Sequence, residues 1–469
     1  MTLLAGIDLG TTALKGVIIN ESGKIFSSQK RTVNYQYGTG SSVEFSANEY
    51  YQTFCRLIND LLSHIPDYEQ VAALSISGAT GNTLLLDKNN EPLIDVISWL
   101  DQRPLDYPQV LEGLHYDEIH KTTGWPFLEI FPLAHLAWLK TKKPEVYHAA
   151  SRYLMNISYL YYRLTNRFVI DHSTATTFYL QDQERGKWHR PLLDLLGINV
   201  SQLPELLPSS TLLGKLSQRA CDETGLSPET EVVLGSFDHP AAARGAGVLK
   251  EGSLLLSCGT SWVGFYPVNN RQTGIDNGML VDPFLSPDGP WAAMFSLPGL
   301  GNSIDALVSH LVHKNEISQK YRIFDLEAGQ SSPAAEQLTI EITKPVEQLL
   351  IWLKKAEKHY SRGDLFRGIM NAVTFEVKRR IDHYEEKGVK ADNITMVGGV
   401  SGSLLWTQVV ANVTEKPIRL INGQMAGATG SAIMAGVGIG LFNNEEEGFN
   451  RIGGKPETVQ PDEIKFRKD

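Results

Sequence analysis

The opening of the chain consists of two apolar runs separated by a polar turn. Residues 3–7 and 16–19 are the apolar runs, and they predict two short β-strands. The turn between them contains Asp8, Gly10, Thr11, Thr12 and Lys15. Turn amides, a glycine and two hydroxyls favour phosphate oxygens, and a hydrated Mg²⁺ would relieve repulsion between a phosphate and Asp8. The alternative is a hairpin whose polar side chains bond only to their own backbone.

Later apolar runs predict strands that alternate with helices. Strands are expected over 24–33, 71–77, 84–87, 232–235, 393–399 and 416–420. Helices are expected over 47–63, 132–147, 150–164, 338–358, 365–387 and 426–440. Runs such as 71–77 are apolar throughout, as are parallel strands that are buried on both faces. The pattern therefore predicts an α/β protein.

The pattern of the opening hairpin is repeated about 250 residues later in the chain. Residues 252–268 repeat its order of apolar strand, polar turn and apolar strand, with Gly259 and Thr260 in the turn. Two copies, each opening one half of the chain, predict a duplicated domain with two facing phosphate loops. Gly398 and Gly399 end another buried strand and precede a helix. They leave room for a flat purine and its ribose against the backbone, although two glycines can also serve only as a tight turn.

Two further stretches carry candidate chemistry. If residues 97–103 form a strand, Trp99, Asp101 and Arg103 share one face and could bind a polyhydroxyl ligand. The alternative is a structural Asp–Arg pair packed under the tryptophan. Asp238 follows a buried strand and begins a segment rich in small residues. It can serve as a general base in a cleft or as a helix N-cap.

Composition narrows the class of protein. The 469 residues correspond to about two to three domains, and the net charge of −10 argues against nucleic acid or an anionic membrane as the main partner. The three cysteines are far apart and form no C-x-x-C pair, which argues against a disulfide framework or a zinc site. No apolar run reaches about 18 residues, and no signal peptide precedes the first strand. We therefore expect a cytoplasmic protein without a membrane span, and the general frequency of symmetric oligomers favours a homodimer.

These motifs, in this order and spacing, resemble those of the FGGY family of carbohydrate kinases. The resemblance covers essentially the whole chain and rests on DLGTTALKG at 8–16, SWLDQRP at 98–104, PLAHLAWLKTKKPE at 132–145, GSFDHPAAARGAG at 235–247, SCGTSW at 257–262, MVGGVSGSLLWTQVVANVTEKPI at 396–418 and GATGSAIMAG at 427–436. It implies an α/β fold of two duplicated, actin-like (ribonuclease-H-like) ATPase domains with an interdomain cleft. Residues 1–243 would form the domain on the sugar side, and residues 244–469 the domain on the nucleotide side.

The resemblance also implies a reaction, namely ATP-dependent phosphorylation of a hydroxyl on a sugar, sugar acid or polyol. ATP and Mg²⁺ would be the cofactors, with Asp238 as general base and Asp8 near Mg²⁺ through water. Phosphate contacts would come from Gly10, Thr11, Thr12, Lys15, Gly259 and Thr260. The adenosine would be bordered by Gly398, Gly399 and Ser403. The sugar would meet Thr80, Trp99, Asp101, Arg103, Asp238 and His239.

The sequence departs from the family pattern on the sugar side. Residues 79–82 are Ala-Thr-Gly-Asn where xylulose kinases usually have a Gln-Met-His-Gly type loop, and His135 replaces the usual lysine of the P-x-x-K helix. The pair His239-Pro240 after Asp238 also differs from the commonest xylulose and glycerol kinase forms. The ATP motifs are intact, so these changes concern the identity of the sugar. An actin- or chaperone-like ATPase, or a non-catalytic sugar-responsive regulator, would need the same phosphate loops but not Asp238.

Overall fold

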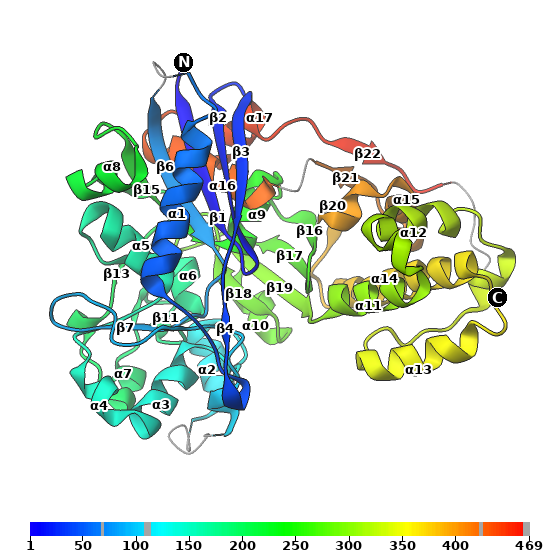
Figure 1. The fold of residues 1–469 in the computed structure, drawn as a ribbon, viewed down its shortest axis with the longest axis horizontal. Helices are drawn as coiled ribbons and strands as arrows, with labels where there is room; N and C mark the ends of the chain where they lie inside the picture. The colour runs from blue at the N-terminus through cyan, green and yellow to red at the C-terminus, as the bar shows by residue number, and fades with distance from the viewer. Residues whose placement is uncertain (67–69, 107–113, 422–424, 463–469) are drawn as a thin grey trace. The chain divides into compact units, whose positions relative to one another are not determined.

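A computed structural model describes residues 1–66, 70–106, 114–421 and 425–462. The chain divides into two compact units, which are drawn in Figure 1. The first unit consists of Met1–Leu249, Val268–Ala293 and Met425–Gly454, and the second of Lys250–Pro267, Met294–Gln424 and Lys455–Asp469. Each unit is therefore assembled from segments that are distant in the sequence, whereas the sequence led us to expect two contiguous domains that meet at residue 243. No helix among the described residues is long and apolar enough to cross a membrane.

The first unit is centred on a six-stranded sheet. In spatial order its strands are β14 (Leu212–Lys215), β15 (Glu231–Phe237), β6 (Val71–Gly78), β1 (Leu3–Leu9), β2 (Ala13–Asn20) and β3 (Ile25–Thr32). β1 runs antiparallel to β2 and parallel to β6, and β6 runs parallel to β15. Strands β1 and β6 are buried along nearly their whole length, which explains why both are continuous apolar runs.

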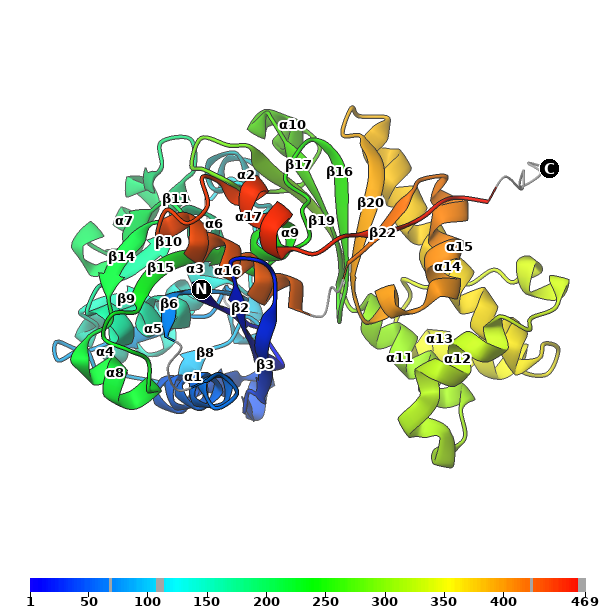
Figure 2. The ribbon, with the colours of Figure 1, turned by 90° about the horizontal axis from the view of Figure 1, so that it is seen from above.

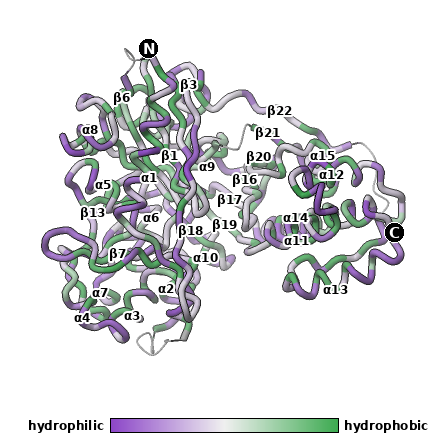
Figure 3. Tube along the Cα trace, in the orientation of Figure 1, coloured by the Kyte–Doolittle hydropathy of each residue, from purple (hydrophilic) through white to green (hydrophobic). Residues whose placement is uncertain are grey.

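Helices and short sheets surround this central sheet. The helices are α1 (Ala47–Leu62), α2 (Tyr116–Thr123), α3 (Pro132–Lys142), α4 (Pro144–Ala149), α5 (Asn156–Thr165), α6 (His172–Thr176), α7 (Arg190–Leu196), α8 (Gln218–Thr224), α9 (Asp238–Gly245), α10 (Arg271–Asp276), α16 (Ala426–Gly438) and α17 (Glu445–Ile452). The short strands are β4 (Gln36–Tyr37), β5 (Val43–Phe45), β7 (Leu84–Leu86), β8 (Val96–Ile97), β9 (Arg152–Leu154), β10 (Val169–Asp171), β11 (Gln181–Asp182), β12 (Lys187–Trp188) and β13 (Glu205–Leu207). Hydrophobic and hydrophilic residues alternate along α1 at helical spacing, as Figure 3 shows, so that one face of the helix is buried.

Helix α16 packs against β1 and α9 through residues without bulky side chains. A Cβ added to Gly6 of β1 would lie 1.9 Å from the carbonyl oxygen of Ala428, and one added to Gly430 would lie 1.8 Å from that of Ala241. The Ser431 hydroxyl donates a hydrogen bond to the Ile7 carbonyl oxygen at 2.9 Å. Backbone thus meets backbone, which is why the sequence of α16 is rich in glycine and alanine. Helix α16 belongs to the first unit although it follows most of the second in sequence.

The second unit is built on a sheet of the same design. The strands of this sheet, in spatial order, are β18 (Leu280–Pro283), β19 (Trp291–Leu297), β17 (Trp262–Val268), β16 (Gly252–Cys258), β20 (Ala391–Gly398), β21 (Ile418–Leu420) and β22 (Glu457–Val459). Its helices are α11 (Leu300–Leu311), α12 (Lys320–Ala328), α13 (Val346–Ala356), α14 (Arg362–Glu385) and α15 (Leu404–Thr414). The strands β17, β16 and β20 lie side by side in Figure 2.

The two sheets confirm the duplication that the repeated hairpin predicts. In the first unit, the hairpin β1–β2 is joined by β6, which runs parallel to β1. In the second, the hairpin β16–β17 is joined by β20, which runs parallel to β16. Each hairpin therefore supplies the strand at the middle of its sheet, and its turn lies at the end of that strand.

Three predicted elements differ from the structure. The predicted helix at 150–164 is a strand, β9, followed by the shorter helix α5, and the predicted helix at 338–358 begins only at Val346, as α13. The helix that starts at Pro132 ends before Pro144, because a proline restricts the residue before it and begins a new helix readily. Residues 97–103 are not a strand, because β8 ends at Ile97 and the Asp101 amide then bonds back to the Ser98 carbonyl oxygen at 3.0 Å. Trp99, Asp101 and Arg103 therefore do not share a strand face.

We predict that Gly430→Ala destabilises the protein by about 1–3 kcal/mol, because the added methyl group would overlap the backbone of α9. The measurement is the thermal unfolding midpoint followed by circular dichroism. Gly329→Ala is the matched control, since the nearest heavy atoms to its Cβ would lie at an ordinary 3.5 Å. Equal midpoints for the two variants would contradict the close packing of α16.

Candidate functional site

Three parallel strands of the first unit end at the same edge of their sheet. The register places Leu9 of β1 opposite Gly78 of β6, and Gly78 opposite Phe237 of β15. Asp8 therefore lies at this edge, and Asp238 follows β15 directly as the first residue of α9. Ligands of α/β proteins gather at the carboxyl ends of strands. The structure thus brings two of the predicted site residues to one edge of the sheet.

Asp8 is a half-buried carboxyl group with one basic and one acidic neighbour. Burial raises its pKa to about 6, Lys15 on the paired strand lowers the pKa, and the charge of Asp238 raises it further. A Cβ added to Gly427 of α16 would lie 2.8 Å from the Asp8 carboxyl carbon, so this glycine leaves the space that the carboxyl group occupies. A carboxyl group whose charge is disfavoured by burial and by a neighbouring carboxylate is suited to a hard cation.

Asp238 is partly open to solvent, with 30% of its side chain exposed. Its Oδ1 accepts a hydrogen bond from the backbone N–H of His239 at 2.7 Å, and the His239 Nε2 lies 3.9 Å from the same oxygen. The N-cap of α9 is Phe237, so the N-cap alternative for Asp238 is wrong. The Asp238 carboxylate is therefore available for chemistry at the end of the strand.

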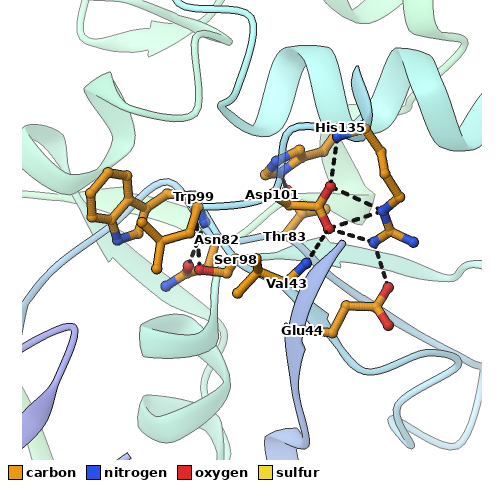
Figure 4. A network of polar contacts seen from close by, with 10 residues as sticks. Val43, Glu44, Asn82, Thr83, Ser98, Trp99, Asp101 and His135 are labelled. Atoms are coloured by element: carbon orange, nitrogen blue, oxygen red, sulfur yellow. Dashed lines mark hydrogen bonds and ion pairs between the residues drawn. The ribbon is translucent and has the colours of Figure 1, made fainter. Parts of the chain in front are cut away.

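The polar turn of the first hairpin contacts the loops after β6 and β8. The Trp99 indole Nε1 donates a hydrogen bond to the Thr11 hydroxyl at 3.3 Å. The Trp99 backbone N–H donates to Asn82 Oδ1 at 3.1 Å, as Figure 4 shows. The Thr12 side chain is exposed, and Gly10 is half-buried, with Ala13 O only 2.8 Å from the position of an added Cβ. The backbone and hydroxyl groups of this turn are therefore partly accessible to solvent, next to Trp99.

Asp101 and Arg103 form a buried ion pair instead of an open binding face. Asp101 is completely buried, and its carboxylate accepts hydrogen bonds from the Val43 amide at 2.9 Å and from the Arg103 amide at 3.0 Å. The Arg103 guanidinium donates to the same carboxylate at 2.7–3.0 Å and to Glu44 at 2.5 Å, and it lies 4.5 Å from the Trp138 ring centroid. Figure 4 shows this network. The geometry favours the structural alternative for this pair.

His135 and Thr80 are buried polar residues close to this network. The His135 Nδ1 lies 2.9 Å from the Thr83 hydroxyl oxygen, and its Nε2 has no partner among the described residues. Burial lowers the pKa of His135 to about 3, although Asp101 opposes this shift, so the ring is neutral at pH 7. Thr80, in the loop after β6, is 4% exposed, and its hydroxyl has no hydrogen-bond partner within the described ranges.

The second unit contains a cavity of about 590 Å³ beside the turn of its own hairpin. The predicted site residues that line it are Gly259, Thr260, Gly399 and Ser403. Gly398 ends β20 next to them with φ +100°, and an added Cβ would lie 2.5 Å from Cys258 O. A Cβ on Gly399 or Gly402 would meet no heavy atom within 4 Å, so the backbone is open to a ligand there.

Sequence reasoning missed the part of this cavity that α11 and α12 form. The additional lining residues include Asn302, Asp305, Tyr321, Arg322 and Asp325. Asp325 accepts a hydrogen bond from the Ser403 hydroxyl at 2.8 Å. No sequence motif marks these residues as part of a site. Their place in the cavity becomes visible only from the tertiary structure, in which α12 contacts the start of α15. The same holds in the first unit for the buried pair Trp125–Asp282, which is joined by a 2.8 Å hydrogen bond.

No group of three or more His, Cys, Asp or Glu side chains that could hold a metal occurs within residues 1–66, 70–106, 114–421 and 425–462. A cation at the edge with Asp8 would therefore take one or two carboxylates from these residues, and water or a ligand would supply the rest of its shell. This arrangement is the one Mg²⁺ adopts at phosphate-binding sites.

Comparison with known proteins decides the family. The N-terminal domain model of the FGGY family of carbohydrate kinases matches residues 3–245, and the C-terminal domain model matches residues 254–439. The chain belongs to the FGGY family of carbohydrate kinases. It is therefore an enzyme that transfers a phosphoryl group, and kinases of this family use ATP as the phosphate donor. Its two units have the actin-like ATPase fold of the sugar kinases.

Its relatives include kinases of neutral sugars and of sugar acids. A xylulose kinase from Staphylococcus epidermidis is 26% identical over 455 residues, which cover 95% of this chain and 89% of that protein. A gluconokinase from Bacillus subtilis is 28% identical over 261 residues, which cover 55% of this chain and 50% of that protein. The structure of ligand-bound xylulose kinase from Lactobacillus acidophilus has a TM-score of 0.84 at 19% identity and covers 98% of this chain and 94% of its own.

We predict that His135 makes the fold sensitive to acid. In the unfolded chain the imidazole takes a proton below about pH 6.5, whereas in the folded protein it does so only near pH 3. The folded state therefore loses stability as the pH falls from about 6.5 toward 3, by up to about 1.4 kcal/mol per pH unit. His135→Gln removes this contribution.

Urea unfolding at pH 5 and pH 7 checks this prediction. The loss of unfolding free energy between the two pH values should be smaller in His135→Gln than in the wild type. His148→Gln is the control, because His148 is exposed and its replacement should leave the wild-type difference intact. An unchanged difference in His135→Gln would contradict the burial of a neutral ring.

Proposed function

We propose that this kinase transfers the γ-phosphoryl group of Mg-ATP to a hydroxyl of a neutral sugar or polyol, with Asp238 as the general base. The observation that carries the proposal is the position of Asp238. It lies where three parallel strands end, it is partly exposed, and it does not cap its helix. A base at such a strand end can meet the acceptor hydroxyl and take its proton as the oxygen attacks phosphorus.

Asp8 fits a Mg²⁺ ion bound together with phosphates. The charge of Asp238 raises the pKa of Asp8, and Lys15 lowers it. Asp8 would hold the ion through water, and the ion when bound neutralises phosphate charge. Gly10, Thr11, Thr12 and Lys15 would meet phosphate oxygens with backbone and side-chain donors.

The cavity of the second unit supports a nucleotide site. Gly259 and Thr260 lie in the turn of the second hairpin, and both are exposed. Gly399 presents open backbone to the same cavity, with Ser403 at the start of α15. In this proposal the second unit holds the nucleoside, and the first holds the acceptor at Trp99, Thr80, His239 and Asp238.

The electrostatics of the first unit favour a neutral acceptor over a sugar acid. The Arg103 guanidinium, which the sequence suggested for a polyhydroxyl ligand, is engaged by Asp101, Glu44 and Trp138 and is therefore not left to pair with a substrate carboxylate. His135 is buried and neutral. The edge where Asp238 lies carries a second carboxylate, Asp8, so a sugar acid would be repelled there.

We predict that a neutral ketose or polyol raises ADP release from Mg-ATP far above a no-sugar blank, and that gluconate and other aldonates raise it less. The measurement is a coupled ADP assay over a panel of ketopentoses, ketohexoses, polyols and aldonates. Equal release with and without every sugar would instead support an actin- or chaperone-like ATPase. The strongest stimulation by an aldonate would contradict the neutral-acceptor assignment.

We also predict that Asp238→Asn lowers kcat by about 10²–10⁴-fold, because the acceptor hydroxyl loses the group that takes its proton. ADP affinity, measured by calorimetry, should stay within about twofold of the wild type if this residue acts only on the acceptor. Asp222→Asn, on the exposed side of α8, is the control for loss of one carboxylate and should keep wild-type kcat. Substantial turnover by Asp238→Asn would exclude it as the base.

A further inference from the structure

The cavity of the second unit contains a carboxylate that the reaction itself does not require. Asp325 lies on α12, is half-buried and lines the cavity together with Gly399, Gly402 and Ser403. A second acidic residue of the cavity, Asp305, is paired with Lys320 at 2.6 Å and with the Tyr321 hydroxyl at 2.6 Å. Asp325 has no basic partner among the described residues. Burial raises the pKa of Asp325, and no ion pair within the described residues neutralises its carboxylate.

The side chain of Asp325 is held in a defined orientation. Its Oδ1 accepts a hydrogen bond from the Ser403 hydroxyl at 2.8 Å, and the same hydroxyl oxygen accepts one from the Trp406 amide at 3.1 Å as the N-cap of α15. The Trp406 ring also packs against Phe324, the residue before Asp325, with centroids 5.4 Å apart. The other oxygen, Oδ2, receives no hydrogen bond from the described part of the chain and is free to accept one from a ligand.

The charge of Asp325 limits which part of a nucleotide can approach it. A carboxylate only accepts hydrogen bonds and repels phosphate, so it must face the nucleoside. The open backbone at Gly399 and Gly402 offers a flat surface for a purine, and Ser403 follows it directly in the chain. The edge of a purine on this surface would point toward the Ser403–Asp325 pair. An exocyclic amino group is the donor that a purine presents along such an edge.

We propose that Asp325 accepts a hydrogen bond from the 6-amino group of the bound purine and so selects adenine over 6-oxopurine nucleotides. The inference rests on the proposed function, because it requires the nucleoside to occupy this cavity. A 6-oxopurine presents a carbonyl oxygen at the same position, and two acceptors that face each other in a partly buried site repel. With Oδ1 engaged by Ser403, the carboxylate is poorly placed to pair with two donors of a guanine.

The experiment compares ADP, IDP and 2′-deoxy-ADP binding to the full-length protein by isothermal titration calorimetry, without any sugar. The wild type should bind ADP more tightly than IDP by on the order of tenfold or more. In Asp325→Asn the ratio should fall to about one, because the amide can turn to donate to the 6-oxo group. The removal of the 2′-hydroxyl should change affinity equally in the two proteins.

Asp305→Asn is the matched control, since it neutralises the other acidic residue of the same cavity, and it should keep the wild-type ratio of ADP to IDP affinity. Thermal unfolding midpoints would show that each variant is folded. Equal affinity of the wild type for ADP and IDP would overturn the inference. So would an equal loss of affinity for ADP and IDP in Asp325→Asn. A third contradicting result would be that Asp325→Asn changes the ratio of ADP to 2′-deoxy-ADP affinity, because Asp325 would then contact the ribose. Failure of ADP itself to bind would overturn the proposed nucleotide site as well, so the two failures are distinct.

Discussion

The parallel pairing of β1, β6 and β15 is the constraint on which the candidate site of the first unit depends. Because hydrogen-bonded parallel strands keep their register, Leu9, Gly78 and Phe237 end at the same edge. Each strand then delivers a different group there: a carboxylate from β1, a small polar loop from β6 and a second carboxylate just after β15. A shift of register by one residue would turn these side chains to the other face of the sheet.

This edge is possible only because α16 approaches without side chains. Glycines at positions 6, 245 and 430 let helix backbone contact sheet and helix backbone directly. Gly427 has a different role, since a methyl group there would occupy the place of the Asp8 carboxyl group. The small residues of α16 therefore serve two purposes. They allow the close packing that buries β1, and they leave the space that the Asp8 carboxyl group occupies.

The acidic side chains named in the first unit differ in how many hydrogen bonds and opposite charges surround their carboxylates. Asp101 is fully buried, and backbone amides and the Arg103 guanidinium surround its carboxylate. Such a group anchors loops, because the loss of either partner would leave a buried charge uncompensated. Asp8 instead has no such set of partners among the described residues, and burial and the charge of Asp238 disfavour its ionised form, while Lys15 favours it. Incomplete satisfaction of this kind is typical of a site that binds a cation or a substrate.

The sequence by itself determined the features that depend on local pattern. Apolar runs and periodicity predicted the inner strands β1, β2, β6, β15, β16, β17 and β20 and helices such as α1 and α14, because burial on one or two faces imposes a pattern on the chain. They did not predict β14, β18, β19 and β22. The repeated hairpin predicted the duplication. Only the tertiary structure decided the rest. The turn after Ile97 buried Asp101 and Arg103, since a hydrogen bond to Ser98 was more favourable there than extension of a two-residue strand. Helix α16 packs in the first unit although most of the second unit precedes it in the sequence, and Asp325 contacts Ser403, 78 residues away. A local sequence pattern cannot predict such contacts, because it does not show which distant backbone or hydroxyl group a residue will contact.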